Sequence, residues 1–207
     1  MKKWMFMAAA AVCGLIGGAQ PSFAQPVEIH FPLAVNPKFL NCLRVPGGPT
    51  PTAQVTVLRG KQNDLLVLKV RGLRPNPAFD VFTVEKSQFL ANGSPDPAFS
   101  NFGLAWYQSD LQADSSGEAE IQIQSIFLDQ IFGFDPSSSL PPTNTFHLGF
   151  WFNRPIDAAA CGFDVSKPTP FNGEHRAGPM AMMSLPNAVT GLGPLCSNPG
   201  PGGTCHP

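Results

Sequence analysis

The sequence predicts an all-β protein, an antiparallel β-sandwich of the Greek-key or immunoglobulin-like type, with one domain and loop-rich termini. Proline and glycine supply 23 and 20 of the 207 residues, which leaves little room for long helices. Apolar runs are short, are separated by turn residues and in places alternate with polar residues at a period of two. No stretch keeps the 3.6-residue period of an amphipathic helix. We therefore expect seven to nine strands.

The first 24 residues are typical of a secretory signal peptide. Lys2 and Lys3 give the positive start, residues 5–18 are an apolar run, and Ser22-Phe23-Ala24 fits the small-x-small cleavage pattern. The apolar run is too short to span a bilayer, and no stop-transfer charges follow it. We expect cleavage near Ala24, a secreted or periplasmic location, and no membrane span after cleavage.

The mature chain is expected to have three parts. Residues 25–52 are rich in proline and form an N-terminal arm, residues 53–190 form the β-sandwich domain, and residues 191–207 form a Pro/Gly-rich tail closed by a disulfide. The length of the mature chain suits one domain with a real core.

Strands are expected where short apolar or alternating runs lie between turns. Within the arm, residues 27–31 suggest a short edge strand. Residues 118–124 alternate cleanly, and residues 145–153 place four apolar side chains on one face and His147, Trp151 and Asn153 on the other. The apolar run 126–134 fits either a strand or a helical turn. The remaining expected strands are 54–59 and 65–71, joined by a five-residue loop, then 78–85 and 103–108, with a single helical turn at 157–161.

Four cysteines remain after removal of the signal peptide. In an oxidising compartment an even number favours two disulfides, for which three connectivities exist. We favour Cys196–Cys205, which closes a short loop in the tail, and Cys42–Cys161, which ties the arm to the body. Their spacing fits no common zinc pattern.

Charge and motifs exclude several function classes. Without Lys2 and Lys3, the 13 basic residues fall to 11 against 14 acidic ones, a formal charge of −3. The basic residues are scattered singly, so we expect no nucleic-acid partner. The sequence has no Gly-x-Ser-x-Gly motif and no histidine pair at helical spacing, which counts against serine hydrolases and zinc peptidases.

Two groups of residues are candidates for ligand contacts. His147 and Trp151 share the face opposite the four apolar residues, where they either bind a ligand or lie under a covering loop. Trp106 and Tyr107 raise the same question, because exposed aromatic rings on a β-sandwich often stack on sugars, whereas strand alternation should bury one of these two.

The loop 169–178 is the densest polar segment. It holds Asn172, Glu174, His175 and Arg176 beside an Asn-Gly turn, and loops often carry function. Asn172 and Arg176 are candidate ligand contacts, and Glu174 and His175 are a candidate acid and base. The same residues also fit an ordinary turn with local ion pairs.

A copper site is a further alternative. Met180, Met182 and Met183 follow His175 closely, and thioethers with an imidazole are soft ligands that suit copper(I). Methionine is also common core filler. We otherwise expect no cofactor.

Three segments carry a resemblance. Residues 102–111 (FGLAWYQSDL), 147–153 (HLGFWFN) and 169–175 (TPFNGEH) are similar to those of a group of uncharacterised secreted bacterial proteins. The similarity runs from about Val55 to Ala177. It implies export and a shared fold, and it implies no reaction, ligand or catalytic residue. The methionines lie outside the similar pattern.

The sequence therefore predicts an exported, non-catalytic binding or cell-envelope module whose extracellular or envelope ligand is unknown. Its contacts are expected near His147, Trp151, Trp106 and the loop 172–176. The alternatives are a secreted hydrolase that uses Glu174 and His175 and, third, a copper-binding periplasmic protein.

Overall fold

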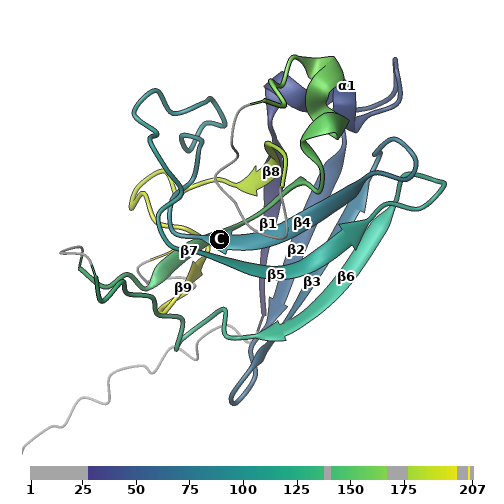
Figure 1. Ribbon diagram of the computed structural model, residues 1–207. Coiled ribbons are helices and arrows are strands. Elements are labelled where there is room, and N and C mark those ends of the chain that lie inside the picture. The colour runs from purple at the N-terminus through teal and green to yellow at the C-terminus, as the bar shows by residue number, and fades with distance from the viewer. Residues whose placement is uncertain (1–27, 138–140, 167–176, 200–204, 206–207) are drawn as a thin grey trace, which may run out of the picture.

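The computed structural model describes residues 28–137, 141–166, 177–199 and 205 and shows an all-β fold (Figure 1). Nine strands belong to one sheet, and every strand pair in it is antiparallel. The predicted class and the expected number of strands are thus confirmed. The strands are β1 (Glu28–Val35), β2 (Thr52–Leu58), β3 (Asp64–Arg71), β4 (Ala78–Val84), β5 (Ala105–Gln112), β6 (Ala119–Ser125), β7 (Thr145–Phe152), β8 (Met180–Ser184) and β9 (Leu195–Cys196).

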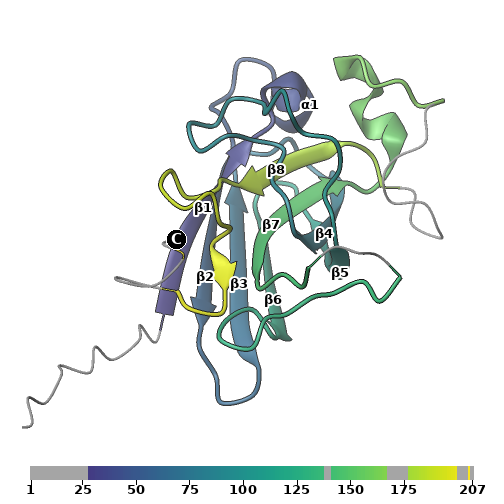
Figure 2. The ribbon, with the colours of Figure 1, turned by 90° about the vertical axis from the view of Figure 1, so that its left-hand side faces the viewer.

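The sheet curls until it is nearly closed. Its strand order is β5-β4-β7-β8-β1-β2-β3-β6, and β9 adds to the start of β7. Figures 1 and 2 show β4, β5 and β7 facing β1, β2 and β3 across the interior. The two halves therefore enclose one core between them, as in a sandwich.

Strand alternation builds this core. In β2 and β3 every second side chain points inward and is buried, and the same holds along β1. The face of β7 predicted to be apolar is confirmed, because Phe146, Leu148, Phe150 and Phe152 all belong to the central core. Phe79 of β4 packs between the rings of Phe150 and Phe152, at 5.0 and 5.4 Å between centroids.

β4 and β7 are buried on both faces. Their outer face is covered by the long connection between β4 and β5, which contributes Phe89 and Phe102 to a second, smaller apolar cluster. Trp151 lies in this cluster, with its ring 5.4 Å from Phe82 and 5.1 Å from Phe102. The sequence leaves two interpretations of Trp151 open, a ligand contact or burial under a covering loop, and the structure shows burial under a loop.

One end of the sheet is capped by short helices. η1 (Pro37–Phe39) and α1 (Leu40–Leu43) follow β1, and η2 (Pro155–Cys161) follows β7. The Cys42–Cys161 disulfide joins α1 to η2, and Cys196–Cys205 closes the tail. Both favoured pairings are confirmed, and so is the helical turn expected at 157–161. No helix in the described ranges is long and apolar enough to cross a membrane.

The arm is not separate from the sheet, which corrects the boundary drawn at residue 53. β1 is longer than the expected edge strand. It pairs with β2 from Glu28 to Leu33, and its last residues, Leu33 to Val35, pair with β8. Pro32 lies in the part that has β2 as its only paired neighbour, where a missing N–H is tolerated. The prolines hid a clear alternation of Ile29, Phe31 and Leu33, all buried.

Other boundaries also differ. The expected strand 103–108 is β5, which begins at Ala105 and continues to Gln112. The tail contributes β9 to the sheet, so the region 191–207 is not loop alone. The run 126–134 is neither a strand nor a helix, because its backbone bonds mainly to other segments.

Candidate ligand-binding groove

The sheet fails to close between β5 and β6, and we call this line the seam. The two strands stand at opposite ends of the strand order, yet they are consecutive in the chain and contact each other. Figure 1 shows them leaving their shared turn together and separating along their length. The seam is therefore closed at the turn and open at the other end.

The turn at the closed end depends on Asp114 and Gly117. The Oδ1 atom of Asp114 accepts hydrogen bonds from the backbone N–H groups of Ser116, at 2.8 Å, and Glu118, at 3.0 Å. Gly117 has a φ of +80°, and a Cβ atom there would collide with the carbonyl of Leu73. That close approach lets the Gly117 carbonyl accept a bond from the N–H of Leu73, at 3.1 Å.

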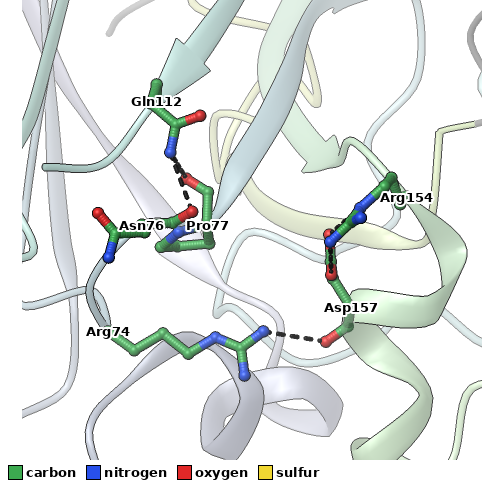
Figure 3. Close-up of polar contacts among 6 residues, drawn as sticks. All are labelled: Arg74, Asn76, Pro77, Gln112, Arg154 and Asp157. Atoms are coloured by element: carbon green, nitrogen blue, oxygen red, sulfur yellow. Dashed lines mark hydrogen bonds and ion pairs between the residues drawn. The ribbon is translucent and has the colours of Figure 1, made fainter.

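Side chains anchor this closed end to the capping helices (Figure 3). The amide of Gln112 in β5 donates to the carbonyls of Asn76 and Pro77, at 2.9 and 3.1 Å. Arg74, in the same loop, donates to the Asp157 carbonyl in η2, at 3.3 Å. The Asp157 carboxylate in turn binds Arg154, at 2.8 Å.

A groove of about 310 Å³ lies at the open end of the seam, and we call it the seam groove. One side of the groove is formed by the start of β5 and by Thr83 of the neighbouring strand β4. The other comes from the end of β6 and the segment 126–132, which we call the groove wall. The lining residues are Thr83, Trp106, Tyr107, Gln108, Ser125, Ile126, Gln130, Ile131 and Phe132.

Exposed apolar side chains concentrate here. In the described part of the chain ten large hydrophobic side chains are exposed, and five of them lie in or beside the seam groove: Trp106, Tyr107, Ile126, Phe132 and Phe134. Soluble monomers rarely expose several large apolar side chains in one patch unless the patch binds a ligand or a partner. This concentration marks the groove as the strongest candidate for a binding surface.

Trp106 and Tyr107 are both half covered, at 40% and 44% exposure, so the expectation that alternation would bury one of them is wrong. Trp106 packs edge-on against Phe146 of the core, at 4.9 Å, and Tyr107 packs against Phe82 on the outer face, at 5.6 Å. Because β5 is an end strand and its pairing with β4 is shifted by a bulge, neither face of it is fully covered at this point.

The Trp106 ring is fixed in place. Besides its contact with Phe146, it lies so close to Gly133 that a Cβ atom there would collide with the indole. Gly133 itself exchanges two backbone hydrogen bonds with Thr143, each 2.9 Å. The indole is thus held as a preformed platform while much of its surface stays exposed.

The groove wall is held by a buried carboxylate. Asp64, at the start of β3, accepts bonds through Oδ2 from the backbone N–H groups of Phe127, at 2.9 Å, and Leu128, at 2.7 Å. Its Oδ1 accepts from the N–H of Gly60, at 3.0 Å. Irregular backbone can lie against the core here because Asp64 satisfies its N–H groups.

The tail braces the same wall. The N–H of Asp129 donates to the Cys196 carbonyl, at 3.3 Å, and the Ser197 hydroxyl donates to the Ile131 carbonyl, at 3.1 Å. Arg59 lies 2.8 Å from the Asp129 carboxylate. The disulfide-closed tail thus touches the site directly.

The groove lining carries no charge at neutral pH. Tyr107 is its one titratable side chain, and burial together with a hydrogen bond to Asp110 raises the pKa of Tyr107 to about 12. Gln108 donates to the Thr83 hydroxyl, at 2.8 Å. Within the described residues, the side chains of Ser125 and Gln130 make no hydrogen bond to the protein, so both can bind a ligand.

His147 lies elsewhere, in a second pocket of about 430 Å³ under the β4–β5 connection. It is 2% exposed, and its Nδ1 is 3.1 Å from both the carbonyl and the hydroxyl oxygen of Ser184. Burial lowers the pKa of His147 to about 4. The seam groove therefore includes Trp106, whereas His147 and the fully buried Trp151 are not part of it.

The three methionines of the copper alternative do not converge. All are buried in β8, where Met182 belongs to the central core and Met180 and Met183 belong to the outer cluster on the other face. Asn172, Glu174, His175 and Arg176 lie outside the described residues, so the hydrolase alternative stays a prediction.

Sequence reasoning missed most of the groove. Of its residues, the sequence predicts Trp106 as a ligand contact and leaves Tyr107 open, but Gln130 and Phe132 fall in the run 126–134, whose apolar character fits a strand or a helical turn. Phe127 and Leu128 in this run are buried. One sequence signal could have indicated the groove: the run 126–134 is apolar but has no regular period and follows directly after a strand. Such a run exposes some of its apolar side chains.

No protein-family model, curated protein or solved structure matched the chain.

Proposed function

We propose that this protein is an exported, non-catalytic binding module that holds its ligand in the seam groove. The observation that carries the proposal is the gathering of exposed aromatic and aliphatic side chains around one uncharged groove. The ring of Trp106 is fixed by Phe146 and Gly133, so little side-chain entropy is lost when a ligand covers it.

The chemistry of the lining favours binding over catalysis. General acid–base catalysis needs a group that titrates near the working pH, and the pKa of Tyr107 lies far above neutrality. The groove instead offers ring faces together with an unoccupied amide and hydroxyl, a combination that recognises a ligand without reacting with it.

The exported location is supported by two kinds of observation. The first 24 residues have the pattern of a signal peptide. The two disulfides are compatible with an oxidising compartment, such as the periplasm or the outside of the cell.

A thermal-shift screen of sugars, peptides and small aromatic compounds tests the proposal, because a ligand that binds the folded state raises the melting temperature. We expect the stabilisation by any hit to disappear in Phe132→Ala, which removes a ring that is 58% exposed and so leaves the core intact. Ile156→Ala, at an equally exposed position on η2, is the matched control and should keep the stabilisation.

The proposal fails if hits stabilise Phe132→Ala and Trp106→Ala as well as they stabilise the unsubstituted protein. Loss of the same hits in a variant of the His147 pocket, such as Leu90→Ala, would move the site there.

A further inference from the structure

We infer that the ligand of the seam groove is a neutral carbohydrate, bound with one ring face against Trp106 and its hydroxyls on Gln130 and Ser125. This inference rests on the proposed function and adds the chemical class of the ligand. Three features of the groove carry it: the lack of charge, the fixed aromatic surface, and the kind of polar group left unoccupied.

No lining residue of the seam groove is charged, and the charged residues nearest to it have partners or lie outside the lining. Asp129 adjoins the lining residue Gln130, but its carboxylate is paired with Arg59 at 2.8 Å. Asp110, whose carboxylate accepts a hydrogen bond from the Tyr107 hydroxyl, is not a lining residue. No cation lies in the lining to attract a sulfate, phosphate or carboxylate, so an acidic ligand would lose its hydration without gaining an ion pair.

The aromatic surface suits a sugar ring. The two faces of a pyranose differ, and the one rich in C–H groups packs on an aromatic ring while the hydroxyls stay at its edge. Trp106 has the fixed orientation that such packing needs, and Phe132 across the groove adds a second exposed ring. A volume of about 310 Å³ is at the lower end of the range for ligand pockets, which fits a short stretch of glycan.

The unoccupied polar groups match hydroxyls. The Gln130 amide and the Ser125 hydroxyl each both donate and accept hydrogen bonds, and so does every hydroxyl of a sugar. A proline-rich peptide, the other ligand that aromatic grooves commonly hold, has tertiary amides that only accept. The polar groups present therefore favour the carbohydrate.

Isothermal titration calorimetry with a panel of short neutral oligosaccharides tests the inference. The panel contains glucose, mannose, galactose, xylose and N-acetylglucosamine oligomers, with uronic-acid and sulfated oligomers and a proline-rich peptide as comparators. We expect binding to at least one neutral member with little dependence on salt, because no ion pair forms.

The variants make the test specific. Trp106→Ala should weaken binding at least about tenfold, as loss of a stacking ring does elsewhere, while Trp106→Phe keeps a ring and should bind within a few-fold. Gln130→Ala should weaken binding as well. Gln124→Ala, at an exposed position of β6 outside the lining, is its matched control and should leave the affinity unchanged.

The possible failures are distinguishable. Binding of the peptide in a Trp106-dependent way, with no glycan bound, would overturn the carbohydrate inference and leave the proposed function standing. Preference for the acidic oligomers with a strong salt dependence would overturn it too. If the hits of the thermal-shift screen still stabilise the Trp106→Ala and Phe132→Ala variants and no oligosaccharide binds, both proposals are wrong.

Discussion

At the scale of single residues, Asp64 shows how one buried carboxylate shapes the site. It accepts three backbone hydrogen bonds, two of them from the groove wall. In Asp64→Asn the amide NH₂ replaces one acceptor by a donor, so at least one buried N–H loses its partner. We expect a loss of about 1–3 kcal/mol in the free energy of unfolding, measured by urea denaturation.

The control for Asp64 is Asp96→Asn. Asp96 accepts a single bond from the N–H of Ala98, at 2.8 Å, in a solvated loop. It should change stability by no more than about 0.5 kcal/mol. Equal effects of the two substitutions would show that Asp64 does not hold the wall.

His147 gives stability a dependence on pH. Burial lowers its pKa from 6.5 to about 4, so the unfolded chain takes up a proton in this window while the folded protein does not. The free energy of unfolding is therefore highest above pH 6.5, where His147 is neutral in both states, and it falls as the pH drops toward 4. The lowering of the pKa from 6.5 to about 4 corresponds to a loss of about 3 kcal/mol in the free energy of unfolding.

Urea unfolding of the protein and of His147→Gln between pH 4 and pH 7 checks this prediction. The other charged side chains that line the same pocket, Glu85, Lys86 and Asp96, are present in both proteins, so the comparison isolates His147. The slope should be steeper in the protein with His147, and parallel curves would contradict the account.

At the scale of elements, the seam depends on the turn between β5 and β6. Gly117→Ala combines a positive φ with a collision against the Leu73 carbonyl, so the turn must shift. Gly47→Ala is the matched control, because Gly47 has a φ of +73° and open space around its Cβ position. We expect Gly117→Ala to lower the urea midpoint clearly more than Gly47→Ala, whose loss should be about 1 kcal/mol.

A closed turn beside an open groove also explains what the sequence could not predict. The strands with clear alternation, such as 54–59 and 118–124, were predictable because each buries one face. The groove was not, because it depends on β5 and β6 lying at opposite ends of the strand order and meeting again. Exposure of Trp106 and Tyr107 follows from that topology, and local alternation alone predicted otherwise. The arm was misjudged because prolines masked the alternation of β1.

At the scale of the whole molecule, the two disulfides have different roles. Cys42–Cys161 spans 119 residues and joins the capping helices, whereas Cys196–Cys205 spans 9 residues beside the groove wall. Loop-closure entropy predicts losses of about 5 and about 2.5 kcal/mol when they are removed by paired Cys→Ser substitutions. Chemical denaturation measures both.

Ligand affinity should show the opposite order. Because the Cys196 carbonyl holds the wall at Asp129, removal of the tail disulfide should weaken binding more than removal of the capping disulfide does, in conditions where both variants are folded. An effect on affinity that simply follows stability would contradict a specific role for the tail.

The most direct test of the central claim is the response of the tryptophan indole signals in ¹H–¹⁵N spectra of residues 25–207, which hold two of the three tryptophans. Trp106 lies exposed in the seam groove and Trp151 is fully buried, and Trp106→Phe assigns the two. We predict that a bound neutral oligosaccharide moves the Trp106 signal and leaves that of Trp151 in place. A ligand that binds by calorimetry without moving the Trp106 signal would show that the seam groove is not the binding site.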